Sequence, residues 1–361
     1  MLYNLFNSLT ENYTVFNLFH YITFRSGCSF FTSLFICLYL IPKLINFQKR
    51  KIIGQPIRNV GPESHQVKKG TPTMGGLIML IASIISTILW ADLNNGYIWI
   101  VIFSFLLFGI IGLTDDILKV YFKHSAGLNG KAKFICQLLV SLLTYFWIQK
   151  YVNPIYTNTI AFPFIKDTLF DIGYLYIAFI CFVIVGTSNA VNLTDGLDGL
   201  ATVPIALCLF CFGSIAYIVG SSKFADHLQL FYIEHAAEIA IFSAATIGAC
   251  LGFLWYNCSP AEIMMGDVGS LCMCGVIGVI SVITKQELNL AIIGGLFVIE
   301  TLSVMIQVTY FKISGGKRIF KMSPIHHHFE KSGWSETKVV VRFWIIALMF
   351  AVIGLSTLKI R

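Results

Sequence analysis

Five aspartates in three short segments give this sequence its clearest chemical signal. The segment "GLTDDILK" contains Asp115 and Asp116, "SNAVNLTDGLDGL" contains Asp195 and Asp198, and "MMGDVGS" contains Asp267. Each segment stands at the boundary of a long apolar run. Carboxylates that meet from three segments would supply the oxygen ligands that a hard divalent cation prefers. The pattern therefore predicts a site for a metal ion and an anionic substrate.

The polar residues of segment 188–200 have two interpretations. Asn192, Asp195 and Asp198 are spaced by three, so on one helix they would span an arc of about 120° and address one ligand. The alternative is capping and turn chemistry, for which Asn, Thr and Asp are favoured. Capping needs one such residue, whereas four of the seven residues 192–198 are polar. We therefore favour a binding role.

The other two aspartate segments also have structural alternatives. Lys119 lies four residues after Asp115, where the two side chains would form a local ion pair on a helix. A lysine at this spacing is equally suited to hold a phosphate beside a carboxylate. Asp267 begins an apolar run, where an acidic residue stabilises a helix N-terminus. Its functional interpretation depends on whether it faces the same side as the other aspartates.

Two further segments suit anionic groups. The segment "KKGTPTMGG" places Lys68, Thr73 and two glycines before an apolar run, where a helix N-terminus favours an anion. The segment "SPIHHHFEKSGW" holds three consecutive histidines, which cannot all bind one metal ion, so we expect phosphate contact there. Ordinary positively charged flanking loops are the alternative for both. Glu300 lies in the middle of an apolar run, and its role stays open.

The composition identifies the fold class. Of 361 residues, 57% are hydrophobic and 12% are charged, whereas a soluble domain has about 25% charged residues. A bilayer-spanning helix needs about 20 apolar residues. The sequence predicts an all-α polytopic membrane protein with one domain, residues 1–361. Its ten expected spans are 24–46, 74–91, 97–118, 132–150, 172–188, 200–220, 238–256, 267–284, 289–311 and 340–358.

The basic residues predict the orientation of these spans. When alternate loops are compared, 18 of the 25 Lys and Arg residues fall on one side, within 43–69, 119–133 and 312–342. Such an excess marks the cytoplasmic side. Both termini are then expected in the periplasm, and the aspartate segments face the cytoplasm. The net charge of +7 reflects this bias and requires no nucleic-acid partner.

Six motifs together resemble a known family. The motifs "KKGTPTMGG", "TDDILK", "NAVNLTDGLDGLA", "FLWYN-SPAE", "GDVGS" and "SPIHHHFEKSGW" have the order and spacing of the phospho-N-acetylmuramoyl-pentapeptide transferases, from about residue 25 to residue 342. The wider superfamily of polyprenyl-phosphate sugar-1-phosphate transferases shares the aspartate motifs, and the histidine loop resembles the muramoyl-pentapeptide branch. Met264 and the Cys and Met residues of "GDVGSLCMCG" depart from the expected Phe and small residues.

The resemblance implies an enzyme of peptidoglycan synthesis in the bacterial inner membrane. Ten transmembrane helices would surround a cytoplasmic active-site cleft. The phospho-sugar of UDP-N-acetylmuramoyl-pentapeptide would pass to undecaprenyl phosphate, giving lipid I and UMP, with Mg²⁺ as cofactor. A homodimer is one option for its assembly. The alternatives are a sister enzyme that uses UDP-N-acetylglucosamine and, remotely, a transporter, for which only Glu300 lies near the bilayer midplane.

The resemblance also suggests roles for individual residues. We expect Asp267 to bind the metal ion, and Asp115, supported by Asp116, to deprotonate or orient the lipid phosphate. A two-step route with an aspartate nucleophile is the rival. The expected substrate contacts are Asn192, Asp195, Asp198 and Asn257 for the nucleotide sugar, Lys68, Lys123, Lys131 and His326 for phosphates, and in addition Thr73, Lys119, His327 and His328.

Overall fold

Apolar helices form almost the entire structure. A computed structural model describes residues 1–3, 6, 14–50, 70–120, 122, 127–163 and 169–359. Within these residues nine helices are long and apolar enough to cross a bilayer, and α3 (Gly75–Trp90) is a shorter apolar helix. The long helices are α2 (Ile22–Arg50), α4 (Gly96–Val120), α5 (Gly130–Ile148), α6 (Leu175–Thr194), α7 (Thr202–Val219), α9 (Ile239–Asn257), α10 (Gly266–Ile283), α12 (Gly295–Ile313) and α14 (Glu336–Thr357).

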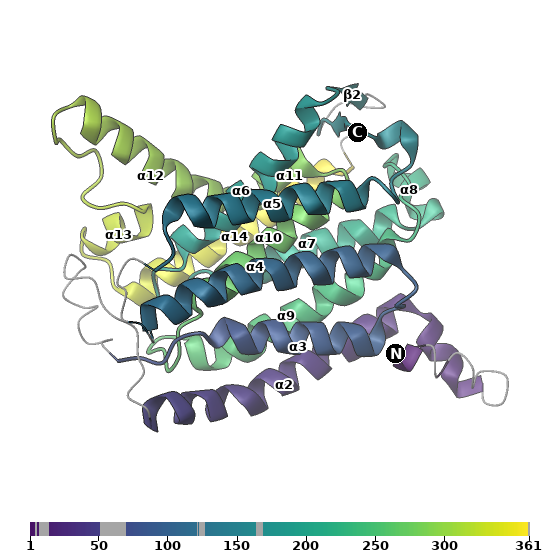
Figure 1. Ribbon diagram of the computed structural model, residues 1–361, viewed down its shortest axis with the longest axis horizontal. Helices are drawn as coiled ribbons and strands as arrows, with labels where there is room; N and C mark the ends of the chain where they lie inside the picture. Colours follow the sequence, from purple (N-terminus) through teal and green to yellow (C-terminus); the bar gives the residue numbers. More distant parts are fainter. Residues whose placement is uncertain are drawn as a thin grey trace.

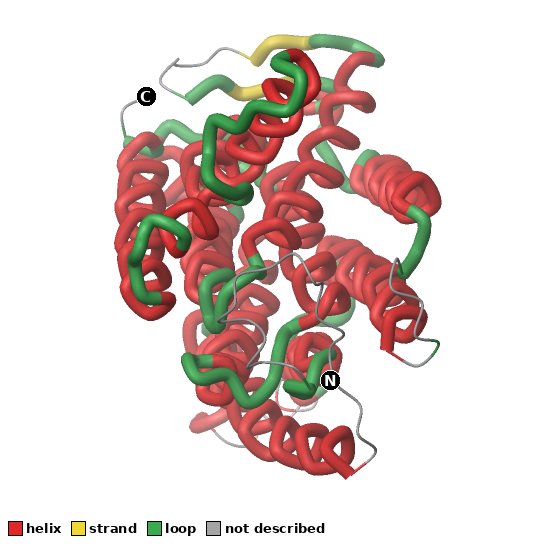
Figure 2. The backbone as a smooth tube through the Cα atoms, turned by 90° about the vertical axis from the view of Figure 1, so that its left-hand side faces the viewer, coloured by secondary structure: helices red, strands yellow, loops and turns green. Residues whose placement is uncertain are grey.

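These helices run side by side, with α10 at the centre of the bundle (Figures 1 and 2). Nearly every side chain of α10 is buried, whereas α2, α5, α12 and α14 expose most of their apolar side chains. An exposed apolar surface of this extent is what a surrounding bilayer would cover. The observed architecture confirms the predicted all-α polytopic membrane fold.

Short elements connect the helices. They are η1 (Thr14–His20), η3 (Pro154–Tyr156), α8 (Ser222–Leu228), η4 (Ala236–Glu238), α11 (Glu287–Ile293) and α13 (Ile325–Glu330). A two-stranded antiparallel sheet, β1 (Thr159–Ala161) with β2 (Leu169–Asp171), pairs Ile160 with Phe170 between α5 and α6. The sequence had not indicated this sheet.

Both described ends of the chain lie at the same end of the bundle. The amino group of Met1 donates to the carbonyl of Ile88 near the end of α3, and Thr357 at the end of α14 donates to Asn289. Asp115 and Asp267 lie at the other end, which we call the carboxylate end (Figure 1). The termini therefore share one side, as an even number of spans requires.

The predicted ninth span, 289–311, is confirmed as α12, but its first residues belong to the separate helix α11. The two helices are separated at Gly294, and α12 extends away from the bundle (Figure 1). Two consecutive glycines lower the helix propensity at this point. A Cβ atom at Gly295 would lie 2.6 Å from the ring of Phe350, so close packing against α14 also requires a glycine there.

Candidate active site

Three carboxylates meet where α4 and α10 come together. One oxygen from each of Asp115, Asp116 and Asp267 lies within 4.8 Å of the others. Asp115 and Asp116 are buried, and Asp267 is mostly buried. Two of the three aspartate segments singled out in the sequence therefore contribute to one cluster.

Two glycines allow these carboxylates to approach. A Cβ atom at Gly112 in α4 would lie 2.3 Å from the backbone oxygen of Asp267, so only glycine permits this contact between α4 and α10. Gly266 has a φ of +78°, a conformation that glycine adopts readily. A Cβ there would lie 2.6 Å from Oδ2 of Asp116. Gly112, which precedes Asp115, and Gly266, which precedes Asp267, thus allow the carboxylates of α4 and α10 to lie close together.

Two lysines hold the carboxylates together. The Nζ atom of Lys119 lies 3.0 Å from Oδ2 of Asp267 and also pairs with Asp115. Lys133 lies 2.6 Å from the same Asp267 oxygen and 4.0 Å from Asp115. The sequence led us to predict Lys131 as a phosphate contact, whereas Lys133 was not predicted. The pattern "GKAK" offered two lysines at the start of α5, and the side chain of Lys131 is exposed while that of Lys133 enters the cluster.

Asp116 differs from its neighbour because it caps α10. Its two oxygens accept hydrogen bonds from the backbone N–H groups of Asp267 and Val268, both at 3.0 Å. These N–H groups lie in the first turn of α10, which has no carbonyl partners of its own. Asp116 therefore fixes where α10 begins, whereas Asp115 accepts one backbone hydrogen bond, from the N–H of Leu128, in addition to its ion pair with Lys119.

The segment after α6 carries the second pair of aspartates. The helix ends at Thr194, so Asn192, Asp195 and Asp198 do not share one helix face, and that prediction was wrong. Asp195 lies in the turn, and its carboxylate has no hydrogen-bond partner among the described residues, although its backbone N–H donates to the carbonyl of Val191. Burial, together with the nearby carboxylates of Asp267 and Asp116, raises the pKa of Asp195 to about 7.

Asp198 and Asn257 connect this turn to the rest of the carboxylate end. Oδ2 of Asp198 accepts from the N–H of Ala261 at 3.1 Å. The amide of Asn257 accepts from the N–H of Gly199 at 3.0 Å and donates to the carbonyl of Ile263 at 2.8 Å. Asn192, by contrast, is half-buried and has no partner among the described residues. Asn192 and Asp195 therefore have the freest polar groups for a ligand.

Glu300 contacts the histidine loop. Its Oε1 lies 3.1 Å from Nδ1 of His326, and its Oε2 accepts from the N–H of Ile325 at 3.1 Å. Both side chains are fully buried. The Nε2 atom of His326 has no hydrogen-bond partner among the residues that the structure describes, and it lies 2.5 Å from where a Cβ atom of Gly196 would be. The buried carboxylate therefore directs one imidazole nitrogen toward the turn that carries Asp195.

The other two histidines have different partners. Nδ1 of His327 lies 2.7 Å from Glu330, and Nδ1 of His328 accepts from the N–H of Lys321. The three histidines thus diverge, and His326 alone directs an unpartnered nitrogen at the turn after α6. Lys68 and Lys123 lie outside the described residues.

The segment before α3, for which we predicted anion binding, instead packs against the segment that precedes Asp267. The N–H groups of Gly75 and Gly76 donate to the carbonyls of Met264 and Met265 at 3.0 and 2.9 Å, so they are not available to an anion. The prediction of an anion site at this helix start was therefore wrong for the backbone. Thr73 is buried, and its backbone is hydrogen-bonded to Gln48. These contacts place the segment that precedes Asp267.

The cluster fits a divalent cation. It offers carboxylate oxygens, which Mg²⁺ and Ca²⁺ prefer, and three carboxylates against two lysines leave an excess negative charge. Within the part of the chain that the structure describes, these aspartates are the one group of three metal-ligating side chains close enough to share an ion.

Carboxylates and lysines gather where the membrane helices end. This arrangement is typical of a membrane enzyme that binds phosphate groups. The family model of glycosyl transferase family 4 matches residues 98–285, which include α4 to α10. Phospho-N-acetylmuramoyl-pentapeptide-transferases of Rickettsia bellii (strain RML369-C) and Rickettsia prowazekii (strain Madrid E) are 55% and 54% identical over 362 positions. Each match covers all of this chain and all of the relative. The chain therefore belongs to the phospho-N-acetylmuramoyl-pentapeptide transferase family.

Proposed function

We propose that the protein transfers phospho-N-acetylmuramoyl-pentapeptide from its UDP conjugate to undecaprenyl phosphate, giving lipid I and UMP. The observation that carries this proposal is the cluster of Asp115, Asp116 and Asp267 with Lys119 and Lys133 at the end of membrane helices. Full-length relatives at 54–55% identity that bear this activity's name support it. The chain acts as a single integral membrane domain of the inner membrane, with the carboxylate end in the cytoplasm.

The reaction joins two anions, and the residues of the cluster suit this task. A lipid-phosphate oxygen forms a bond to the phosphorus that carries the sugar, and the bond from that phosphorus to the bridging oxygen breaks, so UMP leaves with the electron pair. Asp115 orients the lipid phosphate or takes its proton. Lys119 and Lys133 neutralise charge on phosphate oxygens, because catalysis of phosphoryl transfer is mainly positioning and electrostatic stabilisation.

An apolar groove beside the cluster suits the lipid chain. A cavity of about 810 Å³ lies between α5, α6 and α12, lined by Phe134, Leu138 and Phe182 among other apolar side chains. Phe134 directly follows Lys133, which contacts Asp267. An isoprenoid chain in this groove would therefore hold its phosphate next to the cluster while it stays in the bilayer.

Mg²⁺ is the cofactor in this proposal, with Asp267 as its principal ligand and Asp115 and Asp116 as further oxygen donors. When bound, the ion would reduce the repulsion between the two phosphates and stabilise the leaving UMP. Asn192, Asp195 and His326 then engage the nucleotide sugar from the neighbouring turn and loop. Glu300 is a positioning residue, since it acts through His326.

The test is UMP release by the purified full-length protein with undecaprenyl phosphate and Mg²⁺, offered either UDP-N-acetylmuramoyl-pentapeptide or UDP-N-acetylglucosamine. We expect UMP and a lipid-linked muramoyl product from the first donor alone. Release from UDP-N-acetylglucosamine instead would identify the sister activity, and release from neither would refute the proposal. A phospho-sugar attached to the protein, trapped in the absence of lipid, would establish the two-step route.

A further inference from the structure

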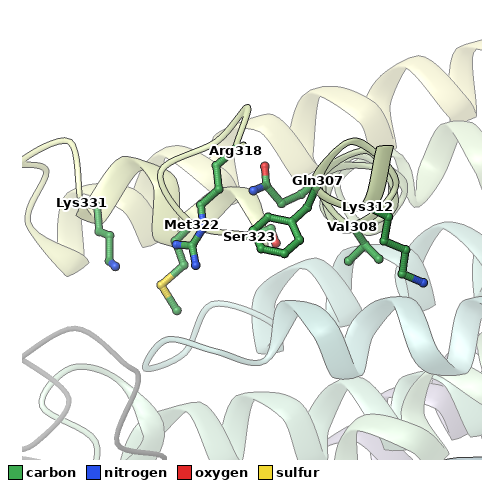
Figure 3. Close-up of a pocket in the computed structure, with 8 residues that line it drawn as sticks. Gln307, Val308, Lys312, Arg318, Met322, Ser323 and Lys331 are labelled. Atoms are coloured by element: carbon green, nitrogen blue, oxygen red, sulfur yellow. The ribbon is translucent and has the colours of Figure 1, made fainter. Parts of the chain in front are cut away.

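A second cavity lies beside the histidine loop. Its volume is about 320 Å³, and it is formed by the end of α12, the connection 314–324 and Lys331. Figure 3 shows the nitrogen ends of Arg318 and Lys331 near one another, whereas Lys312 points away from them beyond Gln307. Arg318 and Lys331 therefore bring two positive charges to one part of a cavity that contains no carboxylate in its lining.

These charges have no internal counter-charge. Residues 312–331 contain five Lys and Arg residues and a single acidic residue, Glu330. Glu330 is occupied by His327. The charged ends of Lys312, Arg318 and Lys331 make no ion pair or hydrogen bond with any described residue. Their complement must therefore come from a ligand or from solvent ions.

The connection that carries Arg318 is held in place. The side-chain oxygen of Gln307, a buried residue, accepts from the N–H groups of Ile319 and Phe320 at 3.1 and 2.9 Å. His328 accepts from the N–H of Lys321 at 3.1 Å. Three hydrogen bonds thus hold the backbone that directly follows Arg318.

The cavity continues the face of α12 that meets the candidate active site. Glu300, Ser303 and Gln307 follow at helical spacing and are all buried, and Phe311 lies one further turn along. Seven residues of helix span about 10 Å. The cavity therefore begins at Gln307, about 10 Å along α12 from Glu300, the residue that holds His326.

We propose that this cavity binds the C-terminal carboxylate of the donor's peptide, with Arg318 as its principal contact and Lys331 beside it. The inference rests on the proposed function. Muramic acid carries a carboxyl group, so its peptide is attached through the amino end and terminates in a free carboxylate. An extended pentapeptide spans at most about 17 Å, which exceeds the separation of about 10 Å along α12 between Glu300 and Gln307. An arginine fork matches a carboxylate in two hydrogen bonds.

A cycle of variants and donors tests the contact. The full-length protein in phosphatidylcholine nanodiscs is assayed with UDP-N-acetylmuramoyl-pentapeptide and with the same donor bearing a C-terminal amide. The wild type should show a KM about twofold to fivefold higher for the amide donor, as expected for one partly exposed charge pair. Arg318→Gln should raise the KM for the acid donor and abolish the difference. Lys317→Gln is the matched control, because Lys317 adjoins Arg318 but does not line the cavity.

Three results would overturn the inference. Equal KM values of the wild type for both donors would show that the carboxylate is not recognised, and an undiminished difference in Arg318→Gln would exclude this cavity. An equal loss with both donors that depends on added phosphatidylglycerol would assign the cavity to an anionic lipid instead. A wild type that transfers from neither donor would refute the proposed function itself, which is a distinguishable outcome.

Discussion

Buried charges occur at both ends of the helix bundle, and the two groups are built differently. At the end opposite the carboxylates, Arg25 of α2 forms a fork with Glu238, with contacts of 2.8 and 2.6 Å. Glu238 also accepts from the N–H of Asp92 at 3.0 Å, and Arg25 donates to the carbonyl of Trp90. One cation and one anion thus match each other and join α2, the end of α3 and the start of α9.

The carboxylate end has no such balance. Asp115, Asp116 and Asp267 outnumber Lys119 and Lys133, and Asp195 adds a fourth carboxylate nearby. Crowded like charges are costly in a buried setting unless a ligand or a metal ion balances them. We infer that the matched pair Arg25–Glu238 stabilises the fold, whereas the unmatched carboxylate cluster serves catalysis. The predictions below measure stability and turnover separately at the two ends.

Among the variants that compare the two ends of the bundle, the largest effect on turnover is expected at Asp115. Asp115→Asn should lower turnover by roughly 10²- to 10³-fold, because it removes a charge from the cluster, while the thermal unfolding midpoint changes little. The measurement is the rate of UMP release together with thermal unfolding of the same preparation. Asp116→Asn should lose both activity and stability, since Asp116 also caps α10. A stable and fully active Asp115→Asn protein would contradict the assignment.

Arg25→Met should produce the opposite pattern. It leaves Glu238 mostly buried without its partner, which costs about 3–5 kcal/mol of folding stability. The variant protein that remains folded at low temperature should retain the turnover of the wild type. Thermal unfolding and UMP release measure the two quantities. The double variant Arg25→Met/Glu238→Leu should recover part of the lost stability. A loss of turnover in folded Arg25→Met protein would show that the two ends of the bundle are not independent.

Glu300→Gln should act on catalysis through His326. Loss of an orienting carboxylate typically costs 10- to 100-fold in activity, so kcat/KM for the donor should fall by about that factor. Ser303→Ala is the matched control, since Ser303 is buried one turn further along α12 and donates only to the backbone of Glu300. Steady-state kinetics on both variants provides the comparison. Equal effects of the two substitutions would indicate a packing role for Glu300.

The smallest effect concerns Asp195 and pH. Its pKa of about 7 in the folded protein lies above the ordinary value of 3.8 for this carboxyl, so the folded state binds the proton more tightly. The stability that this proton provides is complete below the unfolded pKa and is lost as the pH rises through about 7. In metal-free protein, Asp195→Asn should therefore raise the unfolding midpoint at pH 8 and leave it unchanged near pH 4. Thermal unfolding of both proteins from pH 4 to pH 8 measures the difference between their midpoints. An unchanged midpoint of Asp195→Asn at pH 8 would contradict the proposal that crowded carboxylates destabilise the ionised Asp195.

The sequence predicted the membrane helices well, because hydrophobic runs of bilayer length are a strong local signal. The separation of α11 from α12 was harder to predict. Two glycines within an apolar run only weakly disfavour a continuous helix. The cluster was partly predictable, because the aspartates stand at span boundaries on one side. The choice of Lys133 over Lys131 depends on the rotation of α5 against α10, which residue types alone do not determine. The contact between Glu300 and His326 joins residues 26 positions apart through a tertiary fold.

Magnesium titration of UMP release by the wild type and by Asp267→Asn tests the central claim most directly. The two proteins are stripped with a chelator and assayed with UDP-N-acetylmuramoyl-pentapeptide and undecaprenyl phosphate. The account predicts that Mg²⁺ restores turnover of the wild type from near zero, and that Asp267→Asn remains inactive at every Mg²⁺ concentration. Substantial Mg²⁺-dependent turnover in Asp267→Asn would contradict the account.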